Sequence, residues 1–256
     1  MSAATVIAQL RAKADPGRLP WMARVGIDVS HALGVGVPHI RAVAKRCETD
    51  QDLARALWRT GIHEARILAT LVADPEATSD EDMESWAADL SSWDMCDFAA
   101  DLFGRTTAGI AKIPAWTRRP EGYVKRCAFS MIARRAVWAK NAPDREFLGY
   151  LPVIRRGATD PRNEVKKGVS WALRQIGKRN RALHAAAVEE AERILGLAAP
   201  SARWIARDAL RELGSEKTRS RLRTDVSRQV YPKSRGCFPD STSSAGLSGT
   251  VIRSEP

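Results

Sequence analysis

Apolar residues recur every three or four positions along almost the whole chain as far as about residue 223, with polar residues between them. That spacing places the apolar side chains on one face of an α-helix, whereas the alternating, β-branched runs typical of strands are almost absent. The pattern therefore predicts an all-α protein. The predicted helices span residues 3–13, 37–47, 51–60, 63–74, 79–91, 93–104, 108–118, 121–139, 145–157, 162–178, 181–196 and 200–213, with a shorter one at 215–222.

Short loops join these helices into antiparallel pairs, and each pair takes about 35–45 residues, the period of HEAT and armadillo repeats. We therefore expect an α-solenoid of HEAT or armadillo type with a basic concave groove. The second helix of each pair would line that groove, so residues far apart in the sequence could share one surface. Self-similarity between the pairs is weak, which leaves a plain helical bundle as the alternative.

The composition changes after residue 223, where serine, threonine, glycine and proline replace the helical pattern, as in the run Ser241–Ser244. Such a segment cannot bury enough apolar surface to fold by itself. We expect a HEAT-like helical repeat domain over residues 1–223 and a disordered C-terminal tail over residues 224–256.

The charge of the chain indicates a polyanionic partner. It has 41 Lys and Arg against 30 Asp and Glu, a formal charge of +11, and residues 151–223 alone hold 17 Lys and Arg against 8 Asp and Glu. Cations that neutralise phosphates release condensed counterions, which favours binding. The charge alone does not distinguish DNA from RNA or from an anionic membrane.

The four cysteines and four histidines are scattered without the spacing of metal ligands, so we expect buried free thiols, no metal and no cofactor. The chain has no signal peptide and no run of 18 apolar residues. We therefore expect a soluble cytoplasmic protein that does not act at a membrane.

The predicted helix at 162–178 carries a tryptophan on the face that should be solvated. Trp171 points away from the apolar stripe and shares its face with Lys167, Arg174 and Lys178. An aromatic ring among cations suits contact with a nucleic acid. The alternative is a ring covered by a neighbouring helix, with its indole N–H turned toward water.

The predicted helix at 93–104 has the same feature. Trp93 and Asp97 are four residues apart, which places them on one helix face, away from the apolar stripe. The alternative is an ordinary solvated face, because acidic residues are common in the first turns of helices. Further along, Arg126 could bind a phosphate or form a structural ion pair, and the sequence leaves both open.

Taken together, these segments resemble the AlkD-like DNA alkylation repair family over residues 5–215. Trp93 and Asp97 match the family's Trp-Asp-x-x-Asp segment, and Arg126 matches its arginine on a basic helix. The second aromatic of the family falls on Trp171, within Lys167–Arg174. The sequence departs from some members at Val25, where they carry an extra aromatic; this puts the substrate range in doubt.

The resemblance implies a HEAT-like repeat protein that wraps duplex DNA. It would hydrolyse the N-glycosidic bond of N3- or N7-alkylated purines without flipping the base, and we expect it to act as a monomer. Asp97, Trp93 and Trp171 would be the catalytic residues. The residues expected to bind DNA are Arg126, Lys166, Lys167, Arg174 and Lys178.

This chemistry suits a single carboxylate. An alkylated purine already carries positive charge, so its departure needs no proton, and the acid and carboxylate pair of glycosidases reduces to one group. Asp97 would offset the charge that grows on the deoxyribose, and neighbouring cations should keep it ionised. Two other functions stay possible: a non-catalytic HEAT-repeat module that binds nucleic acid, and a solenoid that binds an acidic peptide.

Overall fold

The computed structural model describes residues 1–222, and all regular secondary structure within them is helical. The tail predicted at 224–256 lies outside the described residues. The helices are α1 (Ala3–Arg11), the 3₁₀ helix η1 (Pro16–Arg18), α2 (Leu19–Arg24), α3 (Val37–Ala44), α4 (Gln51–Arg59), α5 (His63–Val72), α6 (Asp80–Ala88), α7 (Trp93–Phe103), α8 (Thr107–Trp116), α9 (Gly122–Trp138), α10 (Asp144–Gly157), α11 (Asn163–Gly177), α12 (Arg181–Leu195) and α13 (Pro200–Leu213).

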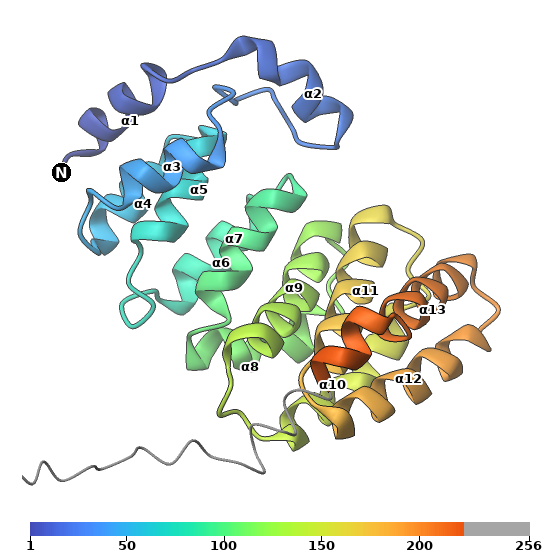
Figure 1. Ribbon diagram of the computed structural model, residues 1–256. Coiled ribbons are helices and arrows are strands. Elements are labelled where there is room, and N and C mark those ends of the chain that lie inside the picture. Colours follow the sequence, from blue (N-terminus) through green and yellow to red (C-terminus); the bar gives the residue numbers. More distant parts are fainter. Residues whose placement is uncertain (223–256) are drawn as a thin grey trace, which may run out of the picture.

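From α4 onward the helices form successive pairs, and the second helix of each pair packs against the second helix of the next. Thus α5 contacts α7, α7 contacts α9, α9 contacts α11 and α11 contacts α13. We call α5, α7, α9, α11 and α13 the second-helix row. Figure 1 shows the pairs following one another from the blue N-terminal helices to the orange α13. This is the arrangement of an α-solenoid, in which each repeat contacts its neighbours rather than one shared core.

Helix α9 is the most enclosed member of the row. It packs against α7, α8, α10 and α11, which explains why its sequence is apolar on most sides and why its buried face could not be assigned from periodicity. Gly157 allows α10 to approach it closely, because a Cβ atom at that position would lie 2.3 Å from the ring of Phe129.

The N-terminal region contains two elements that the periodicity did not predict, η1 and α2. Asp15 caps η1 by accepting the backbone N–H of Gly17 at 3.0 Å, and α2 begins at Leu19, has Pro20 in its first turn and ends after six residues. So short a helix holds less than two turns and gives no hydrophobic period. The turn that follows, at Val25–Gly26, matters because it lies against α7.

A buried carboxylate holds the loop between α2 and α3. Glu64 accepts the backbone N–H groups of Leu33, Gly34 and Val35 at 2.9, 2.8 and 3.1 Å. Gly34 has a φ of 78°, and a Cβ atom there would lie 2.1 Å from the carbonyl oxygen of Asp15. Only glycine fits this close approach. Within residues 1–222, no helix has the length and apolar character needed to cross a bilayer.

Candidate nucleic-acid interface

A network of polar contacts within the second-helix row joins α7 to α9. Asp97 Oδ1 accepts from Arg126 Nη2 at 3.0 Å and from the Ser130 hydroxyl at 3.0 Å, and Asp97 Oδ2 lies 3.2 Å from the same Arg126 nitrogen. Arg126 and Ser130 are one turn apart on α9, so both face the same point of α7. We call these three residues the Asp97 network.

Arg126 extends this network to α11. Its other terminal nitrogen donates to the backbone carbonyl of Glu164 at 3.1 Å, and the residue is only 5% exposed. Its Nε is buried and has no hydrogen-bond partner among the described residues. Of the two roles that the sequence left open for Arg126, the structure realises the ion pair, and binding of a phosphate by Arg126 stays a prediction.

The environment of Asp97 raises the pKa of its carboxyl above the ordinary value. Burial is the largest cause, and the charge of Arg126 and the hydrogen bond from Ser130 offset only part of it. The expectation from sequence considered the cations alone and missed the larger, opposite effect of burial. The side chain is nevertheless 26% exposed, and Oδ2 has a single partner, so it can accept a further contact.

A cavity of about 500 Å³ opens beside this network. We call it the site cavity; it is lined by Val25, Gly26, Trp93, Tyr123, Arg126, Asn163, Glu164 and Lys167. The indole of Trp93 is 37% exposed, and its N–H donates to the carbonyl of Val25 at 3.2 Å. The α2–α3 segment, α7, α9 and α11 therefore all contribute to one concave surface.

A buried ion pair fixes the start of α7, next to Trp93. His63 Nε2 lies 3.0 Å from Asp94 Oδ2, and the Ser92 hydroxyl donates to Asp94 Oδ1 at 2.6 Å. Burial acts to lower the pKa of His63, but Asp94 outweighs it and raises that pKa. Burial likewise acts to raise the pKa of Asp94, but His63 and Ser92 lower it overall. The position of Trp93 is therefore fixed by its own hydrogen bond to Val25 and by the contacts of the next residue, Asp94.

Of the cations predicted on α11, Lys167 is exposed, lines the site cavity and makes no ion pair with the described residues. Lys166 lies over the ring of Trp204, with its Nζ 4.6 Å from the centroid. Trp171 is half-buried against the core one turn beyond Lys167, and its N–H lies 3.0 Å from the side-chain amide of Gln175, whose oxygen accepts it in the flipped orientation of that amide. Trp171 does not line the site cavity.

The other two predicted cations, Arg174 and Lys178, are paired with carboxylates of α13. Arg174 lies 3.4 Å from Asp208 and bonds to Glu212, and Lys178 bonds to Glu212 at 2.5 Å. We call these four residues the α13 clamp. This end of the row therefore carries less free positive charge than the sequence indicated, and DNA binding by Arg174 and Lys178 stays a prediction.

Comparison with known proteins supplies the family. The family model of the DNA alkylation repair enzyme matches residues 6–213. The chain belongs to this family. The resemblance predicted from the Trp93–Asp97 and Lys167–Arg174 segments is confirmed.

A solved structure supports the fold of this DNA alkylation repair family member. It is described as a new family of proteins related to the HEAT-like repeat DNA glycosylases with affinity for branched DNA structures; its identity to this chain is 19% and its TM-score 0.71, and the match covers 87% of this chain and 96% of that one. A designed armadillo repeat protein in complex with a (KR)4 peptide, at 14% identity, covers 79% and 86% with a TM-score of 0.34, too low to add to the argument. No curated protein matches.

The DNA alkylation repair fold brings together Trp93, Asp97, Arg126 and Lys167, but it also adds residues that the sequence analysis missed. Ser130 could have been found, because it is one turn after Arg126 on the same helix. Tyr123 and Glu164 gave no signal, since their place at the site cavity depends on how α9 and α11 pack.

Two further observations bear on the chemistry of the site. Among residues 1–222, no group of three or more potential ligands could hold a metal ion. Burial raises the pKa of the thiols of Cys96 and Cys127, which lie beside the Asp97 network. A buried thiol that stays protonated is a poor nucleophile, so Asp97 is the group better suited to act on a substrate.

Proposed function

We propose that this protein is a DNA glycosylase that hydrolyses the N-glycosidic bond of cationic N3- or N7-alkylated purines in duplex DNA, without flipping the base out of the helix. The observation that carries the proposal is a half-buried Asp97 held by Ser130 and by Arg126, which lines the site cavity together with an exposed Trp93. Family membership supports it.

In the proposed reaction the bond between C1′ and the purine nitrogen breaks, and its electron pair leaves with the base, which becomes neutral. Positive charge develops on the deoxyribose, where Asp97 Oδ2 would stabilise it. Water then adds to C1′ and releases its proton to solvent. Arg126 and Ser130 would keep the carboxylate in place, so that little reorganisation is needed as the charge develops.

Substrate selection would come from charge. A neutral purine gains less than a cationic one from the same carboxylate. Trp93 would contribute a cation–π contact of about 0.5–2 kcal/mol to the cationic base or sugar, and Trp171, one turn beyond Lys167, would contact the flanking backbone. Lys167 would bind a phosphate and set the register of the duplex. The protein would act as a monomer in the cytoplasm, without a cofactor.

The direct test is to incubate the purified protein with methylated duplex DNA and to identify the released bases by mass spectrometry. We expect 7-methylguanine or 3-methyladenine in single-turnover reactions with enzyme in excess. Unmodified duplex of the same sequence is the control and should release no base. Tight binding of methylated DNA with no base released would overturn the proposal.

Two observations favour a second candidate, a non-catalytic module that binds nucleic acid. The Asp97 carboxylate is engaged by Arg126, and a structural relative is described as having affinity for branched DNA. This candidate predicts salt-sensitive binding of duplex or branched DNA without turnover. It leaves the burial of Asp97 next to an open cavity unexplained, because a carboxylate near phosphates weakens binding.

A further inference from the structure

A second cavity, of about 580 Å³, lies beside the turn that connects α10 to α11. We call it the edge cavity, because the ends of α8 and α10 and the start of α9 surround it, outside the site cavity. Its charged lining residues are Arg118, Lys125, Arg156, Asp160 and Arg162. Four cations thus face one carboxylate.

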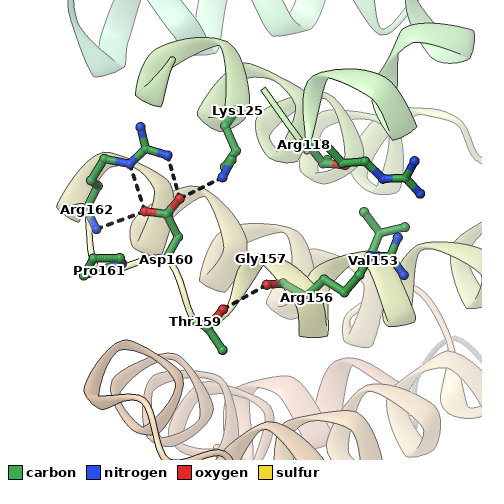
Figure 2. A pocket seen from close by; sticks show the side chains of 10 residues that line it. Arg118, Lys125, Val153, Arg156, Gly157, Thr159, Asp160, Pro161 and Arg162 are labelled. Atoms are coloured by element: carbon green, nitrogen blue, oxygen red, sulfur yellow. Dashed lines mark hydrogen bonds and ion pairs between the residues drawn. The ribbon is translucent and has the colours of Figure 1, made fainter. Parts of the chain in front are cut away.

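Asp160 organises two of these cations. It accepts from Lys125 at 2.9 Å and from two nitrogens of Arg162 at 2.9 and 2.6 Å, and Arg162 is the largest cause of the lowered pKa of its carboxyl. Arg162 also donates to the backbone carbonyl of Pro120. Figure 2 shows Lys125 and Arg162 converging on Asp160.

The other two cations have no partner. Arg118 and Arg156 are exposed, and neither guanidinium makes a hydrogen bond or ion pair with any residue of the described part of the chain. In Figure 2 both extend to the side of the edge cavity where Val153 lies, away from Asp160. Two free guanidinium groups beside an already positive wall repel one another, and an anion that bridges them would relieve that repulsion. Guanidinium groups bind phosphate oxygens in bidentate geometry.

The edge cavity adjoins the site cavity. Lys125 lines the edge cavity and Arg126 lines the site cavity, and the same division separates Arg162 from Asn163. The first turns of α9 and α11 therefore face both cavities. A single extended polyanion can occupy the two at once, whereas a small anion in the edge cavity would make no use of this continuity.

We propose that the edge cavity binds backbone phosphates of the duplex that flanks the lesion, through Arg118 and Arg156, with Lys125 and Arg162 held in place by Asp160. This deepens the proposed function by extending the DNA contact beyond the second-helix row. It rests on DNA being the partner but not on catalysis by Asp97.

The test is the salt dependence of duplex binding by the double variant R118Q/R156Q, measured by fluorescence anisotropy. Each cation that no longer neutralises a phosphate lowers the slope of log K against log salt by about 0.9, so we expect a slope smaller by about 1–2. The matched control is R59Q/R145Q, which removes the same charge from exposed arginines on α4 and on the far end of α10 that have no side-chain partner among residues 1–222. An unchanged slope in R118Q/R156Q, or an equal decrease in the control, overturns the proposal.

Two additional measurements identify the source of the phosphate and test this inference independently of the proposed reaction. Titration calorimetry with inorganic phosphate should give no binding that depends on Arg118 and Arg156. Such binding together with an unchanged DNA slope would indicate a small-anion site and overturn the assignment to DNA. R118Q/R156Q should need more enzyme for half-maximal release of methylated bases, in proportion to its weaker DNA binding, whereas Asp97→Asn should lose release but keep the wild-type slope.

Discussion

The Asp97 network and the α13 clamp both contain carboxylate–arginine pairs but have opposite electrostatic character. Each joins two neighbouring helices of the second-helix row through polar side chains one turn apart. In the Asp97 network, burial raises the pKa of Asp97 by more than Arg126 and Ser130 lower it, so the pKa is raised overall. In the α13 clamp, burial also acts to raise the pKa of Glu212, but Lys178 and Arg174 outweigh it and the pKa is lowered.

The difference indicates where a carboxylate can still act. The two cations of the α13 clamp match the charges of Glu212 and Asp208, and the contact serves mainly to hold α11 against α13. Asp97 shares one arginine with a backbone carbonyl, is partly desolvated and keeps an Oδ2 atom with a single partner. An incompletely compensated anion gains most from a new positive charge.

The largest effect is expected from Asp97→Asn. The amide keeps the shape but loses the charge, so release of 7-methylguanine should fall about 10²–10³-fold in single-turnover reactions, a loss typical of removing a group that stabilises transition-state charge. The control is Asp101→Asn, because Asp101 lies one turn later on α7 and also forms ion pairs, with Arg134 and Arg105. Release within twofold of wild type by Asp97→Asn would remove Asp97 from the mechanism.

Next in size is the effect of Arg126→Gln on stability. It leaves the half-buried Asp97 carboxylate without its cation, and we expect the free energy of unfolding to fall by about 3 kcal/mol at neutral pH. Without Arg126 the pKa of Asp97 rises further, so the folded state takes up a proton more readily than the unfolded chain. The loss should therefore shrink as pH falls through the pKa of the folded protein.

Urea unfolding at neutral and mildly acidic pH measures this effect. The double variant D97N/R126Q should recover part of the lost stability, because no buried charge remains. Arg134→Gln, which removes the partner of the more exposed Asp101–Arg134 pair, should cost less than about 1 kcal/mol. Equal losses of unfolding free energy in Arg126→Gln and Arg134→Gln would show that the Asp97–Arg126 pair is no more important for stability than the more exposed Asp101–Arg134 pair.

A smaller, pH-dependent effect is expected from His63→Gln. Because the pKa of His63 is raised, the stability that its pairing gives the folded state is present at low pH and is lost as pH rises through that pKa. Because the pKa of Asp94 is lowered, the stability that its pairing gives is lost as pH falls through the pKa of Asp94. The pair should therefore stabilise the fold most between the two pKa values, by about 1–2 kcal/mol. Melting temperatures across that window test it, with the exposed His39→Gln as control; a pH-independent difference would refute it.

The smallest expected effect is a difference in DNA binding between Lys167, near the start of α11, and Arg174, near its end. Lys167→Gln should lower the salt slope of duplex binding by about 0.9 and weaken the affinity a few-fold at moderate salt, because one phosphate is no longer neutralised. Arg174→Gln should leave the slope unchanged, because its charge is already matched by Asp208 and Glu212. An equal decrease in Arg174→Gln would show that the α13 clamp opens when DNA binds.

Much of the fold could be predicted because it depends on local pattern. The helical period predicted every helix from α3 to α13 within a few residues, and the four-residue spacing of Trp93 and Asp97 placed them on one face. It missed η1 and α2, which are too short to show a period. The wall of the site cavity at Val25 was missed for the same reason.

What the sequence could not supply was the register between helices. Asp208 and Glu212 are plainly acidic and one turn apart, yet nothing local indicates that they oppose Arg174 and Lys178 rather than solvent. The pairing of Asp97 with Arg126 also depends on how α7 packs on α9. The burial of Asp97, which sets the direction of its pKa shift, follows only from that packing.

The hydrogen bond from Trp93 to Val25 has a consequence for assembly. The partners are 68 residues apart, so on the ribosome the carbonyl that orients this indole is made long before the ring it will hold. The site cavity is complete only when α9 has packed on α7, α11 has packed on α9 and the turn at Val25–Gly26 lies against Trp93. The cavity that would receive DNA therefore forms late in folding, after the individual helices have formed.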